Sequence, residues 1–375
     1  MHRAKEKADR LRAALAHREG DRVPVGEFYW TGFLKRCQRK WGDSFDPYCH
    51  FGLDYVVINP NMDPQIREFE VLEERGEDIV VKTGFGATIR RSGDLPMPSF
   101  QAFSVNSPQE MATFPFDPPD DPRRFFQAGD DQINCIGDAL ARHIPSWDDR
   151  LAPYADDFAL FGGICEPYEY LWRIVGTENA LEWLAAAPEP LGAFVDRIGE
   201  FLWALCRAQI EAGRGRLSGM YIWGDVAYRR GMLFGAQRWR AMFKPHVRAL
   251  VEVCHAHGLM VVYHGCGNAA DILEDMAEIG VDAYNPLEAK AGLDVVELKQ
   301  QFVGRLAFCG NVDVRVLESG DPEAIRREVL YKLRAAQGGG WVFQSDHSVS
   351  SAVAPESYEL ALATLREHGD FPLRI

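Results

Sequence analysis

The chain has 375 residues, with 41 Lys and Arg against 55 Asp and Glu, which gives a net charge of −14. Its hydrophobic fraction of 47% is typical of a globular protein. The acidic balance argues against nucleic-acid binding, because the phosphates would be repelled. No apolar run reaches the roughly 18 residues of a membrane helix, and the charged N-terminus lacks a signal-peptide core. We therefore expect a cytoplasmic protein without nucleic-acid or membrane partners.

The N-terminal segment predicts an amphipathic helix, because Leu11, Ala14 and Leu15 share one face. Short apolar runs bounded by turn residues follow and predict eight strands, at 23–27, 54–58, 158–161, 219–223, 259–263, 282–285, 306–309 and 340–344. Gly162-Gly163 is expected to end the third strand. Helical patterns are found at 190–212, 236–257, 270–279, 294–302, 322–337 and 355–368.

Eight short strands with helical crossovers predict an α/β fold, a single (β/α)8 TIM barrel over residues 1–375. The alternative is a doubly wound sheet, but no glycine-rich dinucleotide turn follows the first strand. Residues 66–91 break the alternation and read as antiparallel strands, with turns at Gly76 and at 84–86. We interpret residues 62–124 as a β-rich insertion after the second strand, which covers or lines one side of the barrel mouth.

Eight cysteines are scattered along the chain without a CxxC pair: Cys37, Cys49, Cys135, Cys165, Cys206, Cys254, Cys266 and Cys309. In a chain of this length, the pattern predicts reduced thiols, most of them small buried residues. Cys266 is the exception, because of where it lies on the predicted barrel.

Reactive groups of a TIM barrel follow the C-terminal ends of its strands. The polar residues at these ends are Glu166 and Tyr168 after the third strand, Asp225, Tyr228 and Arg229 after the fourth, His264 and Cys266 at the fifth, Glu288 after the sixth, Asp313 after the seventh, and Asp346 and His347 after the eighth. These residues are the candidates for catalysis and binding.

His264 and Cys266 stand at i and i+2, so an extended backbone points the imidazole and the thiol the same way. Both groups are zinc ligands, and His347 follows a different strand end. The possible oxygen ligands are Glu166, Asp225 and Asp346. The alternative interpretation makes Cys266 a packed small residue and His264 a hydrogen-bonded wall residue.

Two further groups allow two interpretations each. Asp225 and Arg229 either bind a polar substrate or form a salt bridge that fastens the loop, and Glu288 and Asp313 share this ambiguity. Four aromatic residues either form a wall for a planar substrate or pack in the core. They are Phe28, Tyr29, Trp30 and Tyr168.

Six sequence blocks resemble the uroporphyrinogen decarboxylase superfamily, in the family's order, between residues 224 and 358. They are GDVAYRRGMLFG, FKPHVRALVEVCHAHGL, YHGCGN, LEDMAEIGVDAYNPLE, LAFCGNVDVRVLESG and SDHSVSSAVAPESY. The N-terminal half matches mainly at DRVPV and FGLD. The resemblance implies the same barrel and, by analogy, a homodimer.

The superfamily contains two kinds of chemistry. Its decarboxylases act on a carboxylated tetrapyrrole without a metal, and hold the carboxylates with an arginine-containing loop after the first strand. This chain has no arginine between Arg22 and Lys35, and a poly-anionic substrate would meet Glu27 instead. His347 falls where the decarboxylases also keep a histidine.

The other branch transfers methyl groups between a corrinoid protein and a thiol, with a zinc motif of His-x-Cys and a distant Cys. His264 and Cys266 match this motif, and His347 stands where the second cysteine is expected. The favoured interpretation is a zinc-dependent methyltransferase acting on a small molecule, with zinc on these three residues and Glu166 or the substrate as the fourth ligand.

In this interpretation Asp225, Tyr228 and Glu288 orient the substrate, and the corrinoid is carried by a partner protein. One alternative is a metal-free decarboxylase or lyase with His347, Asp225 and Tyr168 as proton donors. Another is a non-catalytic barrel that binds a tetrapyrrole or a corrinoid.

Overall fold

A computed structural model describes residues 2–76, 78–92, 97–132 and 143–374. Its centre is a curled parallel sheet of seven strands in the order β1-β6-β7-β10-β11-β12-β13. These strands are β1 (Tyr55–Val57), β6 (Ala159–Cys165), β7 (Leu217–Trp223), β10 (Met260–His264), β11 (Ala283–Asn285), β12 (Ala307–Cys309) and β13 (Trp341–Val342). The spatial order follows the chain order without a reversal, unlike a doubly wound sheet.

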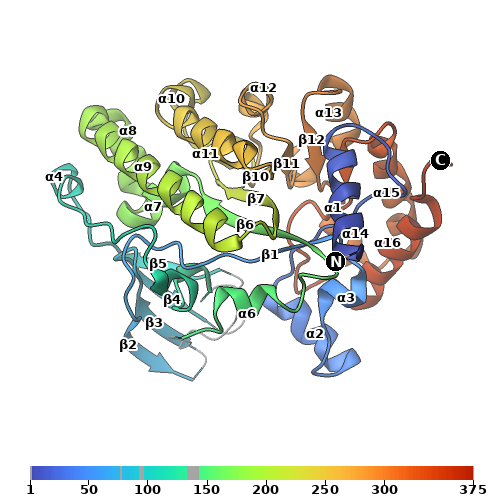
Figure 1. The fold of residues 1–375 in the computed structure, drawn as a ribbon, viewed down its shortest axis with the longest axis horizontal. Coiled ribbons are helices and arrows are strands. Elements are labelled where there is room, and N and C mark those ends of the chain that lie inside the picture. The colour runs from blue at the N-terminus through green and yellow to red at the C-terminus, as the bar shows by residue number, and fades with distance from the viewer. Residues whose placement is uncertain (1, 77, 93–96, 133–142, 375) are drawn as a thin grey trace.

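Helices surround this sheet on the outside, as Figure 1 shows. They are α1 (His2–Leu15), α2 (Thr31–Trp41), α3 (Pro47–Phe51), α4 (Pro108–Met111), α6 (Trp147–Leu151), α7 (Pro167–Val175), α8 (Thr177–Ala186), α9 (Pro188–Gly213), α10 (Ala236–Met242), α11 (Lys244–Ala256), α12 (Leu273–Glu278), α13 (Val295–Gln301), α14 (Val314–Ser319), α15 (Pro322–Leu333) and α16 (Pro355–His368). Short 3-10 turns are η1 (Pro122–Phe125), η2 (Ala270–Ile272), η3 (Ala289–Ala291) and η4 (Arg334–Ala336).

The predicted strand at 23–27 forms only an isolated bridge, between Val25 and Phe343. Even so, the segment joins the two edges of the sheet: Gly26 N donates to Phe343 O (3.0 Å), and Asp54 N donates to Val25 O (2.8 Å). Pro24 has no N–H to give, and Val25 N donates to the Asp54 carboxylate instead of to a strand. These two local features explain why the segment is not a regular strand.

The structure differs from the sequence prediction at two other boundaries, one of a strand and one of a helix. Gly162 and Gly163 lie inside β6 instead of ending it, because the Gln209 side chain bonds to both the N–H and the carbonyl of Gly163. A Cβ on Gly162 would lie 2.0 Å from Gln209 Oε1, so glycine leaves room for this contact.

The helix predicted at 236–257 is two helices, α10 and α11. Pro245 in the first turn of α11 explains the break, since proline cannot continue a helix.

A separate four-stranded antiparallel sheet lies between β1 and β6 in sequence and beside the central sheet in Figure 1. It is built from β2 (Glu70–Arg75), β3 (Asp78–Lys82), β4 (Thr88–Arg91) and β5 (Ser99–Ala102). A small hairpin of β8 (Ala227–Tyr228) and β9 (Gly231–Met232) follows β7. Strands β2, β3 and β4 lie within residues 66–91, where the sequence pattern predicts antiparallel strands, and β5 lies beyond that stretch.

Helix α1 closes one end of the central sheet. Leu11 and Leu15 pack into the cluster that fills the inside of the sheet, together with Tyr55, Phe161 and Tyr221. The carbonyl of Ala14 accepts a hydrogen bond from Gly340 N, just before β13 begins, which places α1 at the N-terminal ends of the strands. The opposite, C-terminal ends therefore remain for the site.

The described cysteines are free thiols, and Cys37, Cys165, Cys206, Cys254 and Cys309 are buried, as predicted. Cys135 lies outside the described residues. Within the described ranges, the structure contains no helix with both the length and the apolar character that crossing a bilayer requires.

Candidate metal site and its surroundings

The candidate site is built by strand ends that the parallel register brings together. His264 is the last residue of β10, and it pairs with Trp223 of β7 on one side and with Asn285 of β11 on the other. The loops that leave these strands therefore start at one level. Asp225, Cys266 and Glu288 follow within three residues of the three strand ends.

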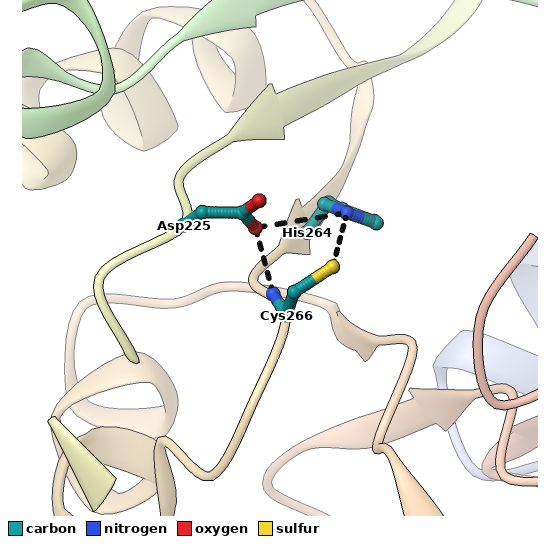
Figure 2. Close-up of side chains that lie close together, drawn as sticks. All are labelled: Asp225, His264 and Cys266. Carbon is teal, nitrogen blue, oxygen red and sulfur yellow. Dashed lines mark hydrogen bonds and ion pairs between the residues drawn. The ribbon is translucent and has the colours of Figure 1, made fainter. Parts of the chain in front are cut away.

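Asp225, His264 and Cys266 form a first group whose potential ligand atoms lie within 4.8 Å of one another. Cys266 Sγ is 3.4 Å from His264 Nε2, and Asp225 Oδ1 is 3.9 Å from the same nitrogen. Asp225 Oδ1 also accepts the backbone N–H of Cys266 (2.8 Å), which fixes the loop that carries the thiol. Figure 2 shows the three side chains converging on one point.

A second group shares Cys266 and adds Glu288 and His347, again within 4.8 Å. Glu288 is 5% exposed, and its Oε1 accepts the N–H of Gly267 (3.0 Å). Its other oxygen pairs with Lys290 at 3.2 Å. Desolvation lowers the pKa of His347, which favours the neutral imidazole that binds metals. Cys266 is thus common to both groups, with His264 in one of them and His347 in the other.

Asn285 sets the orientation of His264. Its side-chain Nδ2 donates to Cys309 O (3.2 Å) and to Gln344 Oε1 (3.0 Å), so its Oδ1 is the atom that faces His264 Nδ1, at 2.6 Å. An amide oxygen only accepts, and Nδ1 must therefore carry the proton. This leaves the lone pair of Nε2 directed toward Cys266, as in metal-binding histidines. No role for Asn285 was predicted from the sequence, although its place at a strand end was a signal.

The donor set fits a divalent metal. Desolvation raises the pKa of the Cys266 thiol well above its usual range, and the nearby Asp225 and Glu288 carboxylates raise it further. A bound dication would supply the positive charge that this cluster lacks and would favour the thiolate. Two imidazoles, one sulfur and carboxylate oxygens are ligands typical of zinc.

Glu166 and Tyr168 belong to neither of the two groups. Glu166 lies behind the turn after β7, where a Cβ on Gly224 would be 2.3 Å from its Cγ. Burial raises the pKa of Glu166 to about 8, and its Oε2 has no hydrogen-bond partner among the described residues. Tyr168 is fully buried against Phe234, with ring centroids 4.5 Å apart.

Several other candidate residues hold loops in place. Asp346 accepts the N–H groups of Ala289 (2.9 Å) and Val314 (2.9 Å), and burial raises its pKa to about 6. Arg229 donates to the carbonyl of Lys290 (3.0 Å). Asp313 caps α14 by accepting from Arg315 N. Tyr228 is 50% exposed on β8, where its backbone carbonyl accepts from Asn268 N.

The expectation that a poly-anionic substrate would meet Glu27 is wrong. Glu27 is 3% exposed, and its carboxylate accepts from Ser345 N (3.0 Å), Ser345 Oγ (2.8 Å) and Phe28 N (3.0 Å). Burial raises its pKa to about 8. Glu27 therefore connects the segment that closes the sheet to the loop after β13, and does not face a ligand.

The aromatic residues near the N-terminus divide into two sets. Phe28 lies 6.5 Å from His264 and Trp30 lies 5.6 Å from His347, both as ring-centroid distances. Tyr29 instead stacks on Phe33 in the core. Phe28 and Trp30 thus lie beside the candidate ligands and Tyr29 does not. Trp223, which the prediction omitted, also lies beside His264, with ring centroids 5.2 Å apart.

A curled parallel α/β sheet with its polar cluster at the strand C-termini defines the class of TIM-barrel-like enzyme folds. Comparison with known families is more specific. The family model described as uroporphyrinogen decarboxylase (URO-D) matches residues 148–368, more than half of the chain, and the chain belongs to this family.

Curated relatives agree over a shorter stretch. A uroporphyrinogen decarboxylase of Pseudomonas putida (strain GB-1) is 29% identical over 178 residues, which cover 45% of this chain and 46% of the relative. One of Pseudoalteromonas translucida (strain TAC 125) is 26% identical over 195 residues, or 48% of this chain and 49% of the relative. The chain thus spans about half the length of the curated relatives it matches.

A solved structure, described as a methyltransferase from Methanosarcina mazei, shares the fold over nearly the whole chain. The two superpose with a TM-score of 0.66, covering 96% of this chain and 98% of the other, at 20% identity. This similarity supports the arrangement of the central sheet and its helices.

Proposed function

We propose that the protein is a zinc-dependent methyltransferase that moves a methyl group between a small substrate and a corrinoid or thiol. The observation that carries the proposal is the pair of ligand groups that share Cys266. His264, Cys266 and His347 would hold the ion, with Glu288 as the fourth donor, because Glu288 and not Glu166 lies with Cys266 and His347. The reaction itself is inferred from the resemblance to the methyltransferase branch of the superfamily.

Asn285 and Asp225 have separate roles around the proposed metal ligands. Asn285 holds the Nδ1–H tautomer of His264, and Asp225 holds the Cys266 loop through its backbone N–H. The Asp225 side chain is 46% exposed and can accept a proton from an incoming thiol at the mouth. When bound, zinc would act as a Lewis acid that lowers the pKa of a coordinated thiol or polarises the heteroatom carrying the methyl group. A corrinoid would be supplied by a partner protein.

The zinc content of the purified protein tests the proposal. We expect about one zinc per chain in purified protein, and its loss in Cys266→Ser. Cys49→Ser is the matched control, because Cys49 is exposed on α3. For the fourth ligand, Glu288→Gln should weaken zinc binding, whereas Glu166→Gln, the same change at a buried carboxyl outside both groups, should not. Zinc-free protein, or a Cys266→Ser variant that keeps both zinc and methyl transfer to a thiol, would overturn the proposal.

A metal-free decarboxylase is the second candidate, and the names of the curated relatives favour it. Burial raises the pKa of Glu166 to about 8, so this carboxyl group holds a proton at neutral pH. Burial raises the pKa of Asp346 to about 6, so this group is protonated mainly in mild acid. Release of carbon dioxide from a porphyrinogen by zinc-free protein would support this function. No release, together with zinc-dependent methyl transfer, would exclude it.

A further inference from the structure

A chain of buried polar side chains runs across the inside of the central sheet and ends at His264. The hydroxyl groups of Tyr221 on β7 and Tyr55 on β1 lie 2.5 Å apart, and Tyr55 Oη donates to Gln344 Oε1 at 3.3 Å. Asn285 Nδ2 donates to the same oxygen at 3.0 Å, and Asn285 Oδ1 lies 2.6 Å from His264 Nδ1. Apart from His264, these side chains are at most 4% exposed, so water does not compete for their hydrogen bonds.

The direction of each hydrogen bond in this chain follows from the groups that make it. The Cys309 carbonyl only accepts, so the Asn285 atom that faces it at 3.2 Å is Nδ2. The two hydrogens of Nδ2 then point at Cys309 O and at Gln344, which must present its oxygen. Tyr55 gives its single hydroxyl proton to that oxygen, and Tyr221 must therefore be the donor in the tyrosine pair. The donors thus converge on Gln344 Oε1.

This arrangement opposes a coupled change of the Asn285 amide and the His264 tautomer. If the amide turned over, its oxygen would face two acceptors, Cys309 O and Gln344 Oε1, and its Nδ2 would face His264 Nδ1. The imidazole proton would then have to move from Nδ1 to Nε2, which removes the lone pair that a metal needs. Gln344 is one of the two acceptors that make the turned-over amide unfavourable, so it contributes to holding the Nδ1–H tautomer.

Gln344 is itself held from two sides. Its carbonyl accepts from Val312 N (3.2 Å), which fixes the backbone after β13. Tyr55, which donates to its side chain, lies on β1 at the other edge of the strand order. Gly26, in the segment that closes the sheet, packs directly on the Tyr55 ring, where an added Cβ would lie 2.2 Å from the hydroxyl oxygen. The Tyr55 hydroxyl is therefore confined to its place beside Gln344.

We infer that Gln344 is a positioning residue for His264 and acts through the Asn285 amide, with the two tyrosines keeping its oxygen in place. The consequence for zinc rests on the proposed function. The tautomer of His264 does not, because it is a property of the metal-free protein. The inference also links the metal site to closure of the sheet, since the Tyr55 bond joins β1 to the chain just after β13.

Replacing Gln344 with methionine tests the inference, because methionine has a similar length but only a weakly accepting sulfur. In metal-free Gln344→Met we expect the ratio of Nε2–H to Nδ1–H tautomer of His264 to rise roughly two- to tenfold, as the loss of one hydrogen bond implies. Long-range proton–nitrogen NMR at alkaline pH, where the imidazole is neutral, measures this ratio. Zinc affinity, measured by competition with a chelator, should fall in proportion to the population of the Nδ1–H tautomer.

Tyr55→Phe removes the donor to Gln344 and should shift the tautomer of His264 in the same direction by a smaller factor. It decides the question if Gln344→Met does not fold. Tyr170→Phe is the matched control, because it removes another fully buried hydroxyl, which donates to Met62 O (2.9 Å), and it should leave the tautomer unchanged. An unchanged tautomer in Gln344→Met, or a shift in Tyr55→Phe no larger than in the control, would overturn the inference. A shifted tautomer in a protein that binds no zinc would support the positioning role and count against the proposed function.

Discussion

Replacing Asn285 with leucine tests whether the structure orients His264 for a metal. Asn285 is fully buried, and its amide bonds to His264 Nδ1 (2.6 Å), Cys309 O and Gln344 Oε1. Leucine has a similar size but cannot accept from Nδ1–H. The imidazole would then be able to rotate or to change tautomer, which removes the Nε2 lone pair from the neighbourhood of Cys266.

The expected size of the effect follows from this geometry. Loss of a partner that orients a ligand weakens metal binding roughly ten- to hundredfold. This corresponds to about 1.4 to 2.7 kcal/mol. The variant also removes the donor of the bond to the Cys309 carbonyl, while Gln344 Oε1 keeps the bond from the Tyr55 hydroxyl (3.3 Å). An unsatisfied buried group costs about 1 to 3 kcal/mol of stability. Metal affinity and unfolding free energy must therefore be measured together.

Two assays separate orientation from general destabilisation. Competition with a chelator reports zinc affinity, and long-range proton–nitrogen NMR on metal-free protein reports the tautomer of His264. Asn285→Asp keeps an acceptor and should keep the Nδ1–H tautomer. Gln209→Leu is the stability control, because it removes another fully buried amide, which among the described residues bonds to the backbone of Gly163. Unchanged zinc affinity and an unchanged tautomer in Asn285→Leu would show that Asn285 does not orient His264.

Two further predictions concern stability. Asp54 is fully buried and pairs with Arg10 and Arg22, so Asp54→Asn should lower the unfolding free energy by about 3 to 5 kcal/mol in urea titrations. A loss under 1 kcal/mol would contradict this. The bond to Asp282 (3.0 Å) raises the pKa of His255. Its stabilising effect is therefore full below the unfolded-state pKa and lost as pH rises through the folded pKa. The stability difference between wild type and His255→Gln should shrink from acid to alkaline pH, and a constant difference would speak against the pair.

Local patterns were sufficient for much of the fold. The helix predicted at 355–368 has those bounds as α16, and the seven strands of the sheet follow one another in the predicted order. Apolar periodicity and turn residues are properties of neighbouring residues, so they survive folding unchanged. The boundaries that failed depend on distant partners: Gln209 extends β6 through two glycines, and the Asp54 carboxylate takes the N–H that Val25 would give to a strand.

The candidate site, like the fold, has features that local sequence predicts and features that depend on distant contacts. The spacing of His264 and Cys266 was enough to predict that they face one point, because side chains at i and i+2 of an extended strand end share a direction. The folded chain was needed to show that Glu288, and not Glu166, lies with Cys266 and His347, and that the Asn285 amide faces His264. The physical reason is that the direction of a side chain beyond a strand end depends on its loop and on the register of the next strand. Both are fixed by contacts between residues far apart in the chain.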